Sequence, residues 1–208
     1  MRYLLLISCA TGLISCSGFY KKMQKTGGDA NCVFAFRPEF TTALYNTQVN
    51  VVGKHLSGLL IIKKMPDSST RIVFSNEAGF KFFDFGFSGS QFTVFYIYKD
   101  MDKKPVIKTL RKDFQLVLMN NLNIHGAYVL QNDSALYYTF PDGKDHYYYV
   151  TDTGCHTLLH MERGNSRKQV MTAVAQNMQN GIPDTIGITH TNFNFEIGLK
   201  RIYNYAER

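Results

Sequence analysis

Two aromatic segments near the middle of the chain, followed directly by an amphipathic one, form the most informative hydrophobic pattern. Residues 71–87 and 91–98 carry apolar side chains at both odd and even positions, so neither predicted strand has a clearly polar face. An antiparallel sheet with one face in water alternates sharply. The pattern therefore predicts that both faces of this part of the sheet are covered, or that one face lines a cavity.

The next segment, Lys103–Met119, is predicted as a helix. Apolar residues recur in it at three- and four-residue spacing, and cationic residues together with Asp113 fill the other side. Asp102 is the expected N-cap, and Pro105 is tolerated in the first turn. Because the nearest apolar surface in the sequence is the aromatic pair of strands, we expect the helix to lie across them.

Most of the remaining sequence is predicted as antiparallel strands, because its connections are too short for parallel crossovers. Val33–Phe36 is a short apolar run that we also interpret as a strand. Residues 168–178 fit either a helix or a strand, and their β-branched content and neighbours favour the strand. Phe193–Lys200 has the cleanest one-sided alternation. We count about ten strands and one clear helix.

Composition fits a single globular domain. The chain has 208 residues, of which 45% are hydrophobic, 14% aromatic and 19% charged, and no Pro- or Ser-rich linker divides it. It contains 16 Phe and 13 Tyr but no Trp, and such an aromatic load favours strands.

The first fifteen residues have the pattern of a secretory signal. Arg2 precedes the apolar run Tyr3–Ile14, which is too short to span about 30 Å of hydrocarbon as a helix. The four residues ending at Cys16 (LISC) resemble a bacterial lipobox, in which a peptidase cuts before an acylated cysteine. The same letters end at Cys9, where the preceding apolar core is too short. We expect lipidation at Cys16; an ordinary signal peptide cleaved elsewhere, or an uncleaved anchor, is the alternative.

The expected organisation is a signal peptide at 1–15, a flexible Gly-, Lys- and Ser-rich tether at 16–31, and a single β domain at 32–208. Acyl chains contribute about 0.8 kcal/mol per buried CH₂, so such an anchor holds a domain to a bilayer without a transmembrane helix. No later segment has eighteen consecutive apolar residues.

Two cysteines, Cys32 and Cys155, are left for the mature chain. An oxidising envelope permits a disulfide between them, but their separation in sequence says nothing about their distance in the fold. Two separate buried thiols are the favoured interpretation. No CxxC or Cys/His ligand set is present, so no structural metal site is expected.

The net charge of +7, or about +6 once Arg2 is removed, comes from basic residues spread along the chain. These cations attract an anionic bilayer, or they form an ordinary solvated surface. Nucleic acid is not an expected partner behind a secretion signal.

No catalytic motif is present, so we expect no enzyme and no cofactor. The chain lacks a GxSxG nucleophile elbow, HExxH and the phosphate-binding GxxxxGK[ST]. His156 and His160 are four residues apart, which on a strand separates them by about 13 Å, too far for one metal ion. On a helix they could share one, but the flanking pattern is extended and supplies no obvious third ligand.

Two further features have a structural and a functional interpretation. Asp84 interrupts an aromatic strand and either faces solvent or pairs with a basic neighbour such as Lys81, because an unpaired buried carboxylate is costly. The tyrosines of 137–149 have a functional interpretation, in which they stack on sugars or line the mouth of a cavity. The structural interpretation, which we favour, is that they pair across the strands of a hairpin.

The order of segments also indicates a family. A lipobox, about ten antiparallel strands and a helix, with the runs LSGLLIIK at 56–63, RIVF at 71–74 and GFKFFDF at 79–85, resembles the LolA/LolB-like superfamily. The resemblance covers most of the mature chain in order. It implies a mainly β (α+β) fold: a curved antiparallel sheet or unclosed half-barrel with helical cover on the concave face.

The resemblance further implies an apolar cavity that holds acyl chains, in a cell-envelope protein anchored at the outer membrane and facing the periplasm. An acyl chain or a lipoprotein is then the expected ligand. The alternative is a non-enzymatic scaffold or assembly accessory that docks an envelope protein partner. Candidate cavity-lining residues are Phe83, Phe85, Phe87, Phe95, Ile97, Leu110 and Phe114.

Overall fold

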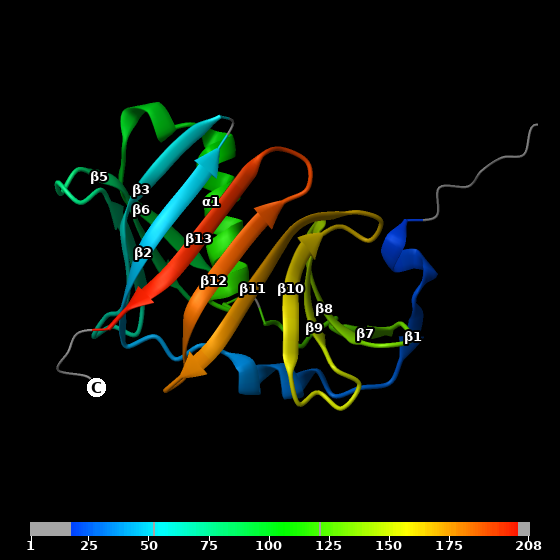
Figure 1. Cartoon of the computed structure of the whole chain (residues 1–208). Coiled ribbons are helices and arrows are strands. Elements are labelled where there is room, and N and C mark those ends of the chain that lie inside the picture. Colours follow the sequence, from blue (N-terminus) through cyan, green and yellow to red (C-terminus); the bar gives the residue numbers. More distant parts are fainter. Residues whose placement is uncertain (1–17, 52, 121, 204–208) are drawn as a thin grey trace, which may run out of the picture.

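The computed structural model describes residues 18–51, 53–120 and 122–203, and in these the chain forms one antiparallel sheet of thirteen strands (Figure 1). The signal segment 1–15 and Cys16 lie outside the described residues. The strands are β1 (Gln24–Thr26), β2 (Thr42–Val51), β3 (Lys54–Lys64), β4 (Thr70–Ser75), β5 (Lys81–Ser88), β6 (Gln91–Ile97), β7 (Tyr128–Gln131), β8 (Leu136–Asp142), β9 (Asp145–Thr151), β10 (Leu158–Gly164), β11 (Gln169–Gln179), β12 (Ile182–His190) and β13 (Phe195–Ile202).

The sheet is unclosed, because β1 and β6 lie at its two ends. The strand order is β1-β7-β8-β9-β10-β11-β12-β13-β2-β3-β4-β5-β6, so every pair except β1·β7 and β13·β2 joins strands that follow each other in sequence. The short connections predicted this meander. The mainly β class is thus confirmed, with more strands than the ten expected.

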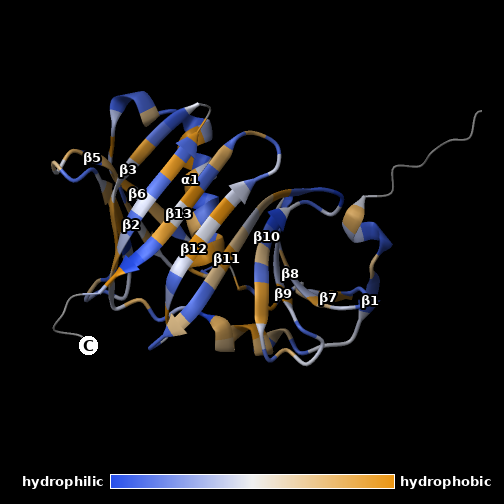
Figure 2. Ribbon diagram, viewed as in Figure 1, coloured by the Kyte–Doolittle hydropathy of each residue, from blue (hydrophilic) through white to orange (hydrophobic). Residues whose placement is uncertain are grey.

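The sheet has an inner face, which packs on the hydrophobic core, and an outer face. In β2 the inner residues Ala43, Tyr45, Thr47 and Val49 are buried and most of those between them are exposed. Figure 2 shows the same alternation of hydrophobic and hydrophilic residues along β13, the strand predicted to have the cleanest pattern.

The α-helix α1 (Lys104–Val117) confirms the predicted helix, but its ends and its polar side differ from expectation. Lys103, not Asp102, is the N-cap residue, and no side chain caps the helix, while Pro105 does lie in the first turn. Asp113, expected on the solvent side, is fully buried. No described helix has both the length and the apolar composition needed to cross a bilayer.

The last five residues of α1, 113–117, are buried. Phe114 contacts the ring of Phe83 on β5, with centroids 5.9 Å apart, and the backbone oxygen of Leu116 accepts a hydrogen bond from the Tyr149 hydroxyl at 3.3 Å. Asp113 contacts β10 and β12, as described below. Contacts with both halves of the sheet explain why every residue from 113 to 117 is buried.

Three 3-10 helices, η1 (Phe19–Lys22), η2 (Ala30–Phe36) and η3 (Lys99–Met101), complete the described elements. The expectation of a strand at Val33–Phe36 was wrong. The Asp29 carboxylate accepts a hydrogen bond from the Asn31 backbone N–H at 2.9 Å and so caps η2, which starts a helical turn where the apolar run alone suggested extension.

The segment between residues 18 and 31, expected as a flexible tether, packs on the sheet. Tyr20 of η1 is buried, stacks on Tyr148 at 4.0 Å between centroids and donates a hydrogen bond to Glu162 at 2.5 Å. β1 pairs with β7. A tether prediction based on Gly, Lys and Ser content could not detect these contacts, which form with residues far away in the sequence.

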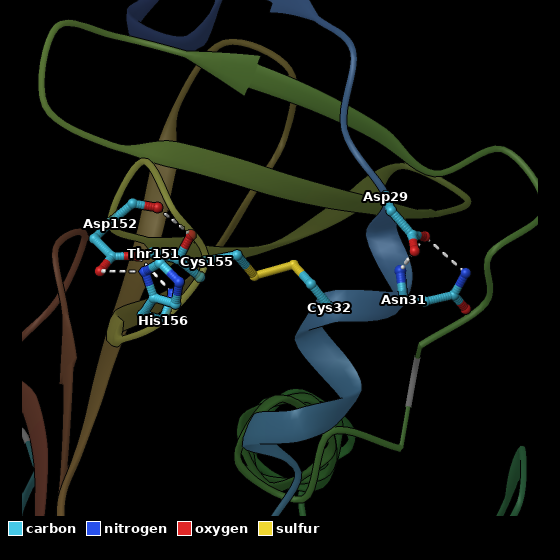
Figure 3. The surroundings of a disulfide bond; sticks show 7 residues. All are labelled: Asp29, Asn31, Cys32, Thr151, Asp152, Cys155 and His156. Carbon is cyan, nitrogen blue, oxygen red and sulfur yellow. Dashed lines mark hydrogen bonds and ion pairs between the residues drawn. A yellow bond between two sulfur atoms is a disulfide. The ribbon is translucent and has the colours of Figure 1, made fainter.

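Cys32 and Cys155 form a disulfide, so the expectation of two separate thiols was wrong (Figure 3). The bond joins η2 to the turn between β9 and β10, and the two Cα atoms lie 6.5 Å apart although 123 residues separate them in sequence. Asp152 fixes that turn, because its carboxylate accepts a hydrogen bond from the His156 backbone N–H at 2.7 Å.

Candidate apolar binding site

An apolar pocket of about 660 Å³ lies between the N-terminal half of α1 and the inner face of the sheet from β13 to β5. This volume falls in the range of about 300–1,000 Å³ that is usual for ligand sites. Its lining residues are Thr47, Val49, Val51, Lys54, Leu56, Leu60, Phe74, Phe82, Phe83, Tyr98, Asp100, Met101, Lys103, Pro105, Val106, Thr109, Leu110, Phe114, Phe193, Phe195 and Ile197.

Strand and helix periodicity build the two walls. On β2 and β3 the lining residues are two or four apart in sequence, as in Val49 and Val51 or Leu56 and Leu60, which places them on the inner face. On α1, Val106, Leu110 and Phe114 are four apart and share one side of the helix. The walls are therefore apolar because both periodic patterns point inward.

Charged groups are found only at the exposed rim of the pocket. Lys54, Asp100 and Lys103 are the charged residues that line it, and all three are exposed. The deeper lining residues Leu60, Phe74, Phe83 and Phe114 are buried. Such a site suits an apolar group whose polar end stays in water.

The structure brings three of the seven predicted lining residues to this pocket, namely Phe83, Leu110 and Phe114. Phe85 and Phe87 are buried in the core on the same face of β5 but are not among the lining residues, and Ile97 is half-buried against the core. Phe95 is 57% exposed and lies on the outer face.

The position of Phe95 follows from a β-bulge. Asp84 is opposite Tyr96 while Phe85 is opposite Val94, so Phe95 is an extra residue in β6. Its ring lies over the Arg71 guanidinium, 4.2 Å from Cζ to the ring centroid. At Gly86 a Cβ atom would lie 2.7 Å from the same ring, so the glycine makes room for it.

The double-sided apolarity of the aromatic strands therefore has two explanations. On β5 both faces are covered, since Phe83, Phe85 and Phe87 face the core and Asp84 is covered from the outer side. On β6, the last strand of the sheet, Phe95 and its neighbours are exposed instead.

Asp84 pairs with basic neighbours, one of the two alternatives for this residue. Its carboxylate accepts hydrogen bonds from Arg71 Nε at 2.7 Å and Nη2 at 2.9 Å, and from Lys81 Nζ at 3.2 Å. Burial favours the neutral acid and raises its pKa, but the hydrogen bonds from Arg71 and Lys81 outweigh burial, so the pKa of Asp84 is lowered.

A second charged group lies beneath α1 and was not predicted. The Asp113 carboxylate accepts a hydrogen bond from Arg163 Nη2 of β10 at 2.9 Å, and its other oxygen lies 2.8 Å from His190 Nε2 of β12. All three side chains are buried. These contacts hold the helix to two strands, below the pocket and away from its lining.

The tyrosines at positions 137, 138, 147, 148 and 149 are all buried, so they do not form a cavity mouth or a sugar-stacking platform. Tyr138 is directly opposite Tyr149 in the β8–β9 pair, as the favoured hairpin explanation requires. His160 lies 2.8 Å from Glu162, and no group of three or more metal-ligating side chains occurs in the part of the chain that the structure describes.

Most of the pocket wall consists of residues outside the predicted lining. Val49, Leu56, Leu60 and Ile197 follow the alternation of strands that were correctly predicted, and Val106 belongs to the apolar stripe of the helix. The signal was present, but the predicted lining was restricted to the aromatic strands next to the helix in sequence. In the structure the pocket lies mainly on β2, β3 and β13.

No protein-family model and no curated protein matches the chain. Solved structures that resemble it include a LolA superfamily protein from Nitrosomonas europaea, with 9% identity, a TM-score of 0.46, and coverage of 84% of this chain and 90% of that one. A putative outer membrane lipoprotein-sorting protein domain from Vibrio parahaemolyticus has 7% identity, a TM-score of 0.42, and coverage of 82% and 87%.

A DUF1329 family protein from Desulfovibrio piger is also similar, with 9% identity, a TM-score of 0.44, and coverage of 83% of this chain and 89% of that one. The LolA/LolB-like resemblance predicted from the sequence is thus also found among solved structures.

Proposed function

We propose that the chain is a lipid-anchored protein of the cell envelope that binds an acyl chain, free or on a lipoprotein, in the pocket beside α1. The observation that carries this proposal is the distribution of polarity in the pocket: apolar walls of about 660 Å³ with charged groups only at the rim. Burial of an acyl chain there contributes about 25 cal/mol to the binding free energy for each Å² of apolar surface removed from water.

In this proposal α1 covers the concave face of an unclosed half-barrel. Its buried C-terminal half is fixed by Asp113, whereas Val106 in the N-terminal half is only half-buried and forms part of the pocket wall. The helix therefore combines a fixed end with a wall that a ligand can contact.

The anchor is supported by the sequence around Cys16. Acylation there places the protein at a membrane surface, and the lipobox pattern supports export to the envelope, with the outer membrane facing the periplasm as the proposed site. One structural neighbour is described as an outer membrane lipoprotein-sorting protein domain, a description with which this location agrees.

A second candidate function is that of a non-enzymatic scaffold or assembly accessory. It is favoured by the exposed apolar residues Val94, Phe95 and Tyr96 on β6, the terminal strand of the sheet. An edge strand presents unpaired backbone donors and acceptors to which another chain can add. An envelope protein partner would then dock there.

Ligand uptake separates the two candidates. The purified protein is delipidated and mixed with palmitate, and native mass spectrometry measures the bound fraction. Val106→Trp places a larger side chain in the pocket and is expected to lower uptake by about tenfold. The ligand can then bury less apolar surface, and each Å² that stays in water costs it about 25 cal/mol of binding free energy.

Lys108→Trp is the matched control, since Lys108 is exposed on the same helix and does not line the pocket. It should leave uptake unchanged. A protein that neither retains a lipid on purification nor takes up palmitate afterwards would contradict the acyl-binding proposal and favour the scaffold.

A further inference from the structure

The first described residues of the chain form a basic, partly aromatic surface at the β1 end of the sheet. We call it the N-terminal basic surface; it consists of Phe19, Lys21, Lys22, Lys25, Arg167 and Lys168, and all six are exposed. Phe19 has 53% of its surface exposed, although the neighbouring Tyr20 is buried.

The surface is held rigidly on the sheet. The Phe19 backbone N–H donates to the Arg167 backbone oxygen at 3.1 Å, which joins η1 to the β10–β11 turn. Gly18 approaches this turn so closely that a Cβ atom on it would lie 2.5 Å from the Arg167 Cα. Tyr20 is fixed by its hydrogen bond to Glu162.

Lys25 joins the same surface from β1. Its Nζ lies 5.3 Å from the centre of the Tyr128 ring, and its strand partner Leu130 packs in the small buried cluster that also contains Tyr20. The disulfide of Cys32 holds the chain a few residues further on. The surface is therefore part of the folded domain.

The charge of this surface is strongly positive. Within the described residues, none of its five cations takes part in an ion pair. Glu162 beneath it is buried and already accepts the Tyr20 hydrogen bond, and the exposed acids of the neighbouring strands and loops are Asp29, Asp133 and Asp142. Such a surface complements an anionic partner.

Only Ser17 separates Cys16 from Gly18, and two residue steps of chain span at most about 7 Å. If Cys16 carries an acyl group, as proposed above, the N-terminal basic surface is the part of the domain nearest to the bilayer. Lysines and arginines attract anionic headgroups, and aromatic side chains favour the membrane interface.

We infer that the N-terminal basic surface docks on an anionic lipid bilayer, so that the domain is held with the β1 end of its sheet at the membrane and the β6 end away from it. This inference rests on the proposed anchor for its biological setting, but it concerns a different surface from the pocket. The exposed β6 residues are then left accessible in the aqueous space.

The absence of tryptophan from the chain gives a direct test. In the chain from Ser17 to Arg208, which keeps every described residue and lacks the acylated cysteine, Phe19→Trp introduces a single tryptophan at the proposed contact, and its emission is excited selectively over that of the tyrosines. We expect a blue shift of its emission with vesicles that contain phosphatidylglycerol, and a much smaller shift with phosphatidylcholine alone. The matched control is Phe95→Trp, a similarly exposed ring at the other end of the sheet, which should not respond.

Two triple variants with the same change in net charge test whether binding depends on the cations of the N-terminal basic surface. Lys21→Gln, Lys22→Gln and Lys25→Gln together should weaken vesicle binding by at least about tenfold, whereas exposed lysines elsewhere, changed as Lys63→Gln, Lys99→Gln and Lys104→Gln, should have little effect. Equal effects of the two triples, no response at position 19, or a response at position 95 instead would overturn the inference. Failure of palmitate uptake would leave these results unaffected.

Discussion

Asp113 on α1 and Arg163 on β10 form a buried ion pair, with 2.9 Å between Oδ1 and Nη2 and fifty residues between them in the sequence. The second carboxylate oxygen faces His190 of β12 at 2.8 Å. A carboxylate with partners on two strands fixes both the position and the rotation of the helix. Because this helix forms one wall of the pocket, the ion pair also sets the shape of the proposed ligand site.

Asp113→Asn should therefore destabilise the protein strongly. Without the Asp113 charge, the buried Arg163 keeps only a longer contact with Asp145, 3.9 Å between Nη1 and Oδ1, among the described residues. We therefore expect a loss of about 3–5 kcal/mol in the free energy of unfolding. Urea denaturation followed by circular dichroism measures it. Asp102→Asn is the control, because Asp102 is exposed just before the same helix and does not cap it. Equal effects of the two substitutions would show that the Asp113 contacts contribute little.

Reduction of the Cys32–Cys155 disulfide should lower the free energy of unfolding by about 2–4 kcal/mol, because the bond closes a long loop and so restricts the unfolded chain. The measurement compares urea denaturation with and without dithiothreitol. The double variant Cys32→Ser, Cys155→Ser should have the stability of the reduced protein and no response to dithiothreitol. A variant as stable as the oxidised protein would contradict the prediction.

Sequence alone predicted the features that depend on local periodicity. The strands around β2, β3, β4 and β13, the helix and the extended state of 169–179 all follow from spacing within a segment. Predictions from the sequence were wrong where the position of a side chain depends on a single register shift or on a partner far away in the sequence. The bulge at Phe95 moves that ring to the outer face, because one inserted residue changes which side of the strand faces the core.

Long-range pairing explains the other errors. Asp113 lies on the polar side of an isolated helix, and only the approach of Arg163 and His190 makes its burial favourable. Likewise the N-terminal segment has the composition of a tether, and only Glu162 and Cys155 show that it is fixed to the domain. These partners lie 50 to 142 residues away, beyond any pattern within a segment.

Asp84 should make stability depend on pH in the acid range. Its pKa is lowered in the folded protein, because hydrogen bonds from Arg71 and Lys81 outweigh the effect of burial. The contribution of Asp84 to the free energy of unfolding is therefore fully present above the pKa of an aspartate in the unfolded chain, about 3.9. It is lost as pH falls through the lower pKa that Asp84 has in the folded protein.

The measurement is the difference in free energy of unfolding between the parent protein and Asp84→Asn. We expect about 1.5–3 kcal/mol near pH 7, typical of hydrogen bonds to a charged group, and a smaller difference below pH of about 4. The exposed Asp133→Asn variant corrects for the general loss of one negative charge. A difference that does not change with pH would contradict the assignment.

Gly58 on β3 lies directly against the backbone of Ser75 on β4, so a larger residue at position 58 should destabilise the sheet. A Cβ atom at position 58 would lie 2.1 Å from the Ser75 carbonyl oxygen and 2.8 Å from the Asn76 Cα. Both are backbone atoms that cannot move aside as a flexible side chain does, so β3 and β4 must separate locally. Gly58→Ala should cost at least about 1–3 kcal/mol.

Gly187→Ala is the matched control, since this glycine also lies within a strand and a Cβ atom there has no neighbour within 4 Å. It should be neutral, or stabilising by about 0.4–1 kcal/mol, because alanine restricts the unfolded chain. Because β3 and β4 carry the pocket residues Leu60 and Phe74, Gly58→Ala should also lower palmitate uptake, and Gly187→Ala should not. Unchanged stability and uptake in Gly58→Ala would mean that the two strands can separate without disturbing the pocket.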